Sequence, residues 1–125
     1  MKIRIKGNSI RYRLTKTEVE TLSKKGRYSE KTKIGDQTFH YTVCADANKT
    51  HLDAAFADNT ITLSVPKKDT LEWPGNEQVG FQHTVVLPNG GKLSLLLEKD
   101  FVCMDATLED QSDNYPNPKL DQNIS

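Results

Sequence analysis

The side chains best placed to do chemistry in this chain are basic and lie within its first thirteen residues. Lys2, Arg4, Arg11 and Arg13 alternate with apolar residues on either side of a Gly-Asn turn. If that turn has two residues, Arg4 faces Arg11 and Lys2 faces Arg13 on one side of a β-hairpin. Like charges directly opposite each other destabilise a sheet. We therefore expect an anion to neutralise these four residues, which we call the basic face.

Two kinds of anion are compatible with the basic face. The first is an external ligand, because the planar guanidinium group of arginine donates two parallel hydrogen bonds to a phosphate. Lys6 lies on the same face, and Lys31, in a later basic stretch with Lys33, would extend such a site. The predicted anion-binding residues are therefore Lys2, Arg4, Arg11, Arg13 and Lys31. The second is the protein's own acids, which would leave the face a solvated charged surface.

The net charge of zero conceals an uneven distribution along the chain. Residues 1–33 contain eleven lysines and arginines and three glutamates, whereas residues 98–125 contain two lysines and seven acids. The two ends attract each other if the fold brings them together, with Asp110 and Asp113 as the predicted partners of the basic face. The neutral total, and the lack of aromatic residues on the basic face, argue against nucleic-acid binding.

Other clusters of reactive residues predict no catalytic or metal site. The C-terminal acids between Asp105 and Asp113 lack the glycine and the terminal glutamate of an EF-hand loop. His51 has acidic neighbours but no partner at metal-ligand spacing, and His83 lies on an apolar alternation that indicates a core position. No nucleophile motif, phosphate-binding loop or dinucleotide fingerprint is present. The sequence therefore predicts no catalytic residues, no metal and no cofactor.

Four β-hairpins are predicted from alternating side chains and turn residues. The first spans residues 2–13, and the others span residues 28–44, 51–65 and 79–98. In the third hairpin, every large apolar residue falls on one face when Leu52, Ala54 and Phe56 align with the second strand. In the fourth, a loop of three residues pairs Phe81 and His83 with leucines of the following strand. This last hairpin is expected to form the centre of the core.

Two short surface helices are predicted between these hairpins. Thr15 and Glu18 form the two ends of a capping box, and Gly26 is a plausible C-terminal stop. A second helix would begin at Pro66 and end before Pro74. The sequence shows no internal repeat beyond the hairpin rhythm.

These elements predict a mainly β protein of the α+β class. Residues 1–118 form a single domain of about eight antiparallel strands in successive hairpins, with one or two short surface helices. The strands are expected to curl into a barrel or fold into a sandwich, and alternation alone does not separate the two. A barrel that encloses the basic face would form a polar, anion-binding cavity, whereas a sheet with that face outward would present a basic surface. Residues 119–125 are predicted to be a frayed C-terminal tail.

The composition favours a cytoplasmic protein without a membrane partner. No apolar run approaches the roughly 20 residues that a bilayer-spanning helix needs. The basic N-terminus is not followed by the apolar segment of a secretion signal. Cys44 and Cys103 are the only cysteines, and we expect both to be free thiols in a reducing compartment.

Three stretches of the chain resemble a family of small uncharacterised bacterial proteins, mostly from Bacteroidetes. They are MKIRIKGNSIRYRLTKTEVE, NTITLSVPK and EKDFVCMDATLEDQSDNYPNP. The KIRIKGNSIRYRLTK opening and the EDQSDNYPNP ending are the most specific. The resemblance implies a cytoplasmic setting and supplies no catalytic residues.

Taken together, these observations favour a small, non-enzymatic binding or interaction module, with an unknown protein partner or a small anionic ligand. One alternative is an enzyme or sensor for an anionic, phosphate-bearing small molecule bound in a charged barrel. Triphosphate tunnel enzymes use such a design, but this chain lacks their ExExK opening. Another is a structural partner that pairs through a free sheet edge.

Overall fold

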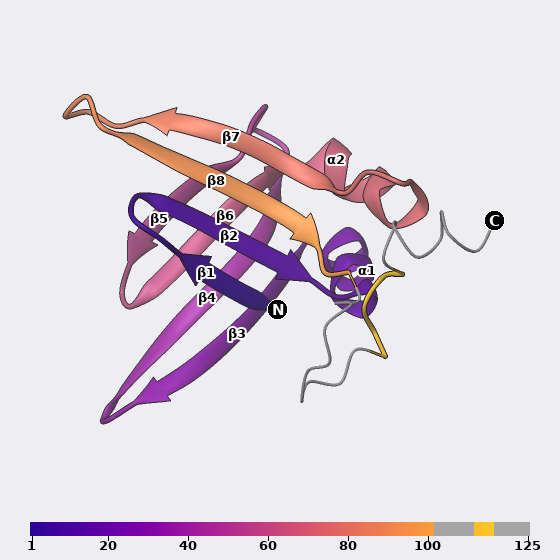
Figure 1. Cartoon of the computed structure of the whole chain (residues 1–125), viewed down its shortest axis with the longest axis horizontal. Coiled ribbons are helices and arrows are strands. Elements are labelled where there is room, and N and C mark those ends of the chain that lie inside the picture. The colour runs from indigo at the N-terminus through magenta and orange to yellow at the C-terminus, as the bar shows by residue number, and fades with distance from the viewer. Residues whose placement is uncertain (102–111, 117–125) are drawn as a thin grey trace.

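A computed structural model describes residues 1–101 and 112–116 of the chain as two four-stranded sheets and two short helices (Figure 1). The elements are β1 (Lys2–Ile5), β2 (Ser9–Leu14), α1 (Lys16–Lys25), β3 (Arg27–Ile34), β4 (Gln37–Asp46), β5 (Asp53–Ala57), β6 (Thr60–Pro66), α2 (Lys67–Glu72), the 3-10 turn η1 (Trp73–Gly75), β7 (Gly80–Val86) and β8 (Lys92–Lys99). The strand orders are β1-β2-β8-β7 and β3-β4-β6-β5. The predicted mainly β, α+β class is confirmed, and residues 119–125 lie outside the described residues.

All four predicted hairpins form, and they form in the predicted registers. Arg4 pairs with Arg11 in the first and Phe56 with Ile61 in the third. The hairpins are antiparallel, as predicted, but they join one another through parallel pairs, β2 with β8 and β4 with β6. Alternation does not distinguish these parallel pairs from antiparallel ones, so the sequence did not predict them. Among the described residues the two sheets do not close into a barrel.

The hydrophobic core lies between the two sheets and is built mainly from the central strands. Its fully buried members include Tyr12 and Leu97 from the first sheet and Val43 and Leu63 from the second. The Tyr12 hydroxyl crosses the core and donates a hydrogen bond of 3.1 Å to the carbonyl oxygen of Ile61. Burial raises the pKa of this hydroxyl well above its usual range. The inward faces follow directly from the period-two alternation of the strands.

The two helices pack against each other at one end of the sandwich, and several of the hairpin turns lie at the other end (Figure 1). The predicted capping box is present, since Thr15 accepts from the Glu18 backbone while Glu18 accepts from the Thr15 backbone. Gly26 ends α1 in the left-handed conformation (φ 77°), which glycine adopts without strain. Val19 of α1 and Trp73 of η1 are fully buried, so this end of the molecule is closed by apolar side chains.

The chain repeats one topology twice. Each half is a hairpin, a helix and a second hairpin: β1-β2-α1-β3-β4 and then β5-β6-α2-β7-β8. Exchanging the halves converts the order of the first sheet into that of the second. The registers agree too, because Ile5 and Phe56 face Ile10 and Ile61 at matching positions of the two halves. The fold therefore contains an approximate twofold axis that the residue identities do not reveal.

Candidate functional site

The basic face lies on the outward side of β1 and β2. Arg4 pairs with Arg11, and Lys2 pairs with Arg13. These residues point away from the core because they alternate along β2 with the fully buried Tyr12 and Leu14. The open sandwich therefore presents the basic face to solvent.

The acids that neutralise part of the basic face come from β8 and the residue after it. The Glu98 carboxylate lies 3.1 Å from Arg11 Nε and 3.9 Å from Arg13 Nε. The Lys2 ammonium lies 3.2 Å from the Asp100 carboxylate. Glu98 reaches both arginines because the parallel pairing of β2 with β8 sets it beside Arg13. One carboxylate thus forms ion pairs with two guanidinium groups.

The predicted acidic partner Asp113 lies elsewhere. Its carboxylate accepts hydrogen bonds from the Thr17 hydroxyl at 3.0 Å and from the Thr17 backbone at 3.4 Å. A hydrogen bond from Thr15, followed by those from Thr17, holds the pKa of Asp113 below its usual range. The Asp113 carbonyl also accepts from the Lys16 backbone at 3.0 Å. Asp113 therefore stabilises the N-terminus of α1 rather than the basic face, and Asp110 falls outside the described residues.

A polar hollow of about 240 Å³ opens beside the basic face, and Arg4, Lys6, Ser9 and Arg11 line it. No acid lines this hollow. In the described part of the chain, neither Arg4 nor Lys6 forms an ion pair. Two guanidinium groups, one ammonium group and one hydroxyl group can all donate hydrogen bonds. The hollow is therefore suited to a small oxyanion.

Of the five predicted anion-binding residues, the structure brings together Lys2, Arg4, Arg11 and Arg13. Lys31 lies on β3 of the other sheet, opposite His40, and is exposed. Lys6, which the sequence placed on the same face, joins Arg4 and Arg11 at the hollow, as does Ser9, which the prediction did not include. The available signal for Ser9 was its alternation with Arg11 and Arg13 along β2, which places all three on one face.

A buried polar cluster joins the edge strands β1 and β3, and the sequence did not predict it. The amino group of Met1 forms ion pairs with Glu18 and, at 3.0 Å, with Glu30. The Tyr28 hydroxyl donates to Glu30 at 3.2 Å. Burial, followed by the negative charge of Glu18, raises the pKa of Tyr28. This cluster connects the two sheets.

The equivalent place between β5 and β7 holds two histidines instead. The rings of His51 and His83 stack with centroids 4.5 Å apart and an interplanar angle of 8°. His51 lines a polar hollow of about 260 Å³ together with Asp69 and Gln78. Across residues 1–101 and 112–116, no group of three or more His, Cys, Asp or Glu side chains is placed to hold a metal ion.

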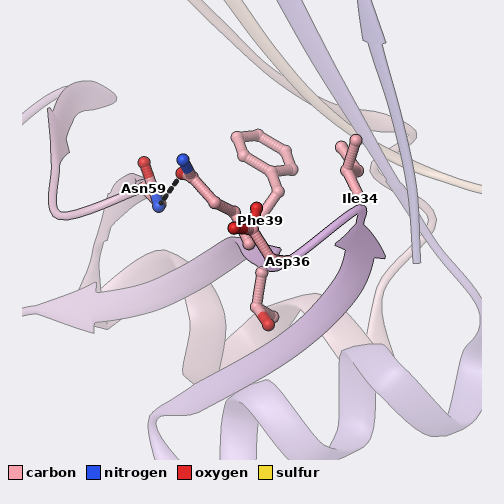
Figure 2. A pocket seen from close by; sticks show the side chains of 6 residues that line it. Ile34, Asp36, Phe39 and Asn59 are labelled. Atoms are coloured by element: carbon pink, nitrogen blue, oxygen red, sulfur yellow. Dashed lines mark hydrogen bonds between the residues drawn. The ribbon is translucent and has the colours of Figure 1, made fainter.

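A third hollow, of about 330 Å³, lies at the turn between β3 and β4 (Figure 2). Asn59 donates to the Gln37 side chain at 3.0 Å across it. Asp36 is the one charged residue in this lining, and Figure 2 shows it pointing away from Phe39 and Ile34. This hollow offers no arrangement for catalysis.

Comparisons with known proteins identify the family of the chain but no individual curated relative or solved structure. In the part of the chain that the structure describes, no helix is long and apolar enough to cross a membrane. No curated protein and no solved structure matches the sequence. The resemblance to an uncharacterised family is confirmed by a family model that covers residues 1–119. The chain belongs to that family, a family of unknown function (DUF7009).

Proposed function

We propose that this protein is a small, non-enzymatic module that binds a phosphate-bearing anion on the basic face. The observation that carries the proposal is the hollow lined by Arg4, Lys6, Ser9 and Arg11, which contains three cationic groups and no acid. Lys2 and Arg13 have the acids of β8 and its flank as partners, and Arg11 pairs with Glu98 at 3.1 Å. In the described part of the chain, Arg4 and Lys6 form no ion pair, so positive charge is least compensated at these two residues of the hollow.

The residue types at the hollow favour phosphate among the possible anions. A guanidinium group presents a planar pair of donors that matches two phosphate oxygens, and an ammonium group adds a point charge. Arg4 and Arg11 lie directly opposite each other on neighbouring strands, so both reach one tetrahedral ligand. A bound dianion would also relieve the repulsion between them.

The same lining supports binding rather than turnover. It contains no histidine or carboxylate that could act as a general base for the Ser9 hydroxyl. The alternative is an enzyme or sensor whose ligand lies inside a charged barrel. It lacks support, since the described strands form two separate sheets and no closed barrel. Lys31, on the other sheet, does not enter the proposed site.

The proposal extends to the setting of the protein. We place it in the cytoplasm of bacteria, in keeping with the resemblance of its opening and ending motifs to proteins of Bacteroidetes. Cys44 is a free thiol, as expected in a reducing compartment.

Titration with inorganic phosphate and pyrophosphate at constant ionic strength tests the proposal. We expect saturable binding and a dose-dependent rise in melting temperature. Arg4→Gln should weaken binding about tenfold or more, because it removes charged hydrogen bonds. Lys31→Gln, an exposed lysine on the other sheet, is the matched control and should bind as the wild type does. Absence of saturation, or equal weakening by both variants, would refute the proposed site.

A further inference from the structure

An apolar cleft opens between the two sheets at the end of the sandwich away from the helices. Its volume is about 370 Å³, within the range of small-molecule pockets. Eight side chains line it, and all are apolar: Ile5, Ile10, Phe39, Ala54, Ala55, Phe56, Ile61 and Leu93. No charged residue or hydrogen-bonding side chain belongs to this lining.

The cleft follows from the repeated topology and is not an irregular gap in the packing. Its lining contains matching positions of the two halves: Ile5 with Phe56, Ile10 with Ile61, and Leu93 with Phe39. It therefore lies where the two halves meet, near the approximate twofold axis. The opposite end of the sheets is closed by buried residues of the helices, whereas no helix of the described residues lies at this end (Figure 1).

Two large side chains at the cleft are exposed to solvent. Ile5 is 56% exposed and Phe56 is 70% exposed. Exposed apolar surface that borders a concave apolar site is typical of ligand-binding grooves and of protein interfaces. The charged residues beside the cleft then indicate which polar group such a ligand carries.

The basic hollow and the apolar cleft share one hairpin. Arg4 and Lys6 flank Ile5 in the sequence, and Ser9 and Arg11 flank Ile10. Arg4 and Ile5 point to opposite faces of β1, but β1 is an edge strand. A flexible ligand can therefore pass over its free edge, beside Lys6 at the turn, and contact both sites.

We propose that the cleft holds the hydrocarbon chain of an amphipathic anion whose phosphate head group is bound by Arg4, Lys6 and Arg11. This inference rests on the proposed function and specifies its ligand class as an alkyl or acyl phosphate. The charge of the flanking residues selects an anionic head group, and the uniformly apolar lining selects a hydrocarbon chain rather than a polar one.

Calorimetric titration with three probes tests the proposal: inorganic phosphate, octyl phosphate below its micellar concentration, and 1-octanol. We expect octyl phosphate to bind at least about tenfold more tightly than phosphate, since each buried methylene group adds affinity. In ¹³C spectra it should shift methyl signals of Ile5, Ile10, Ile61 and Leu93. Octanol should bind more weakly than octyl phosphate.

Two matched variants separate the chain from the head group. Phe56→Ser should lower the affinity for octyl phosphate toward that for phosphate, with phosphate binding unchanged. Val86→Ser removes a similarly exposed side chain (68%) that does not line the cleft, and it should leave both affinities unchanged. Because Phe56 is largely exposed, its replacement should leave the circular dichroism spectrum intact.

The outcomes distinguish the inference from the function beneath it. Equal affinities for phosphate and octyl phosphate would overturn the inference and leave the proposed function standing. Failure of both to bind would overturn the two together. Octanol binding as tight as octyl phosphate would exclude the head-group contact. A dimer that dissociates in Phe56→Ser and binds no octyl phosphate would assign the cleft to a second copy of the chain.

Discussion

The two halves of this chain share a topology and differ in the chemistry of their outward faces. The basic face, Lys2, Arg4, Arg11 and Arg13, corresponds in the second half to Asp53, Ala55, Thr62 and Ser64. The inward positions of both hairpins remain apolar. The second half shows that this hairpin folds with small, neutral or acidic residues at the same places. The cations of the first half are therefore not required by the fold, which supports a role in binding.

The two halves also differ in the side chains beside their helices, α1 and α2. In the first half, Glu18 of α1 meets Glu30 and the Met1 amine in a buried polar cluster. In the second, Asp69 occupies the position of Glu18, and α2 has no side-chain cap. His83 occupies the position of Glu30 and stacks on His51. One half thus depends on buried charge where the other uses stacked rings.

The largest expected effect comes from breaking the polar cluster of the first half. Glu18→Ala removes the partner of a buried amine and one side of the capping box, and should cost about 2–4 kcal/mol of unfolding free energy. Asp69→Ala, at the matching position of α2, should cost less than about 1 kcal/mol. Urea denaturation measures both. Equal losses would mean that the two helix starts carry equivalent interactions.

A smaller effect concerns the acid limb of the stability profile. Asp113 has a lowered pKa in the folded protein because Thr15 and Thr17 bond its carboxylate. Its contribution is therefore complete above the unfolded pKa of about 4 and is lost as the pH falls through the folded value. Asp113→Asn should flatten the decline of the melting temperature below about pH 4. A decline identical to that of the wild type would mean that other carboxylates account for it.

The smallest expected change in stability comes from replacing Arg11 with threonine, the residue type at the matching position of the second half. Arg11→Thr removes a partly exposed ion pair with Glu98, which is worth at most about 1 kcal/mol, while Arg13 remains beside that carboxylate. Phosphate affinity should nevertheless fall about tenfold or more. Thermal melts and phosphate titrations of the same sample test this separation. A variant that loses stability but keeps its affinity would make the basic face structural.

Local features of the fold were predictable from the sequence, and the joining of the hairpins was not. Alternation fixes the pairing of Arg4 with Arg11 because a slip by one residue would invert both faces. Thr15, Glu18 and Gly26 mark the ends of α1 through capping chemistry that needs no tertiary contact. In contrast, Glu98 becomes the partner of Arg11 only through the parallel pairing of β2 with β8.

The site was predictable in its residue types but not in its surroundings. Four of its five predicted cations share one face because they belong to one hairpin, whereas Lys31 needed knowledge of which sheet β3 joins. Electrostatic attraction between the chain ends suggested Asp113, but its hydrogen bonds with Thr17 position it at α1. The internal repeat was not predictable from residue identities, because the two halves share only their apolar pattern; Arg11, for example, corresponds to Thr62.

The parallel pairing of β2 with β8 has a consequence for how the chain folds. The first sheet unites the first hairpin with the last, so that Ser9 lies beside Ser94. The second sheet needs only the continuous segment from β3 to β6. Closing a long loop costs entropy before the stabilising contacts have formed, so pairing between distant strands is slow. During synthesis, the second sheet can therefore assemble early, while β1 and β2 wait for β8 to leave the ribosome.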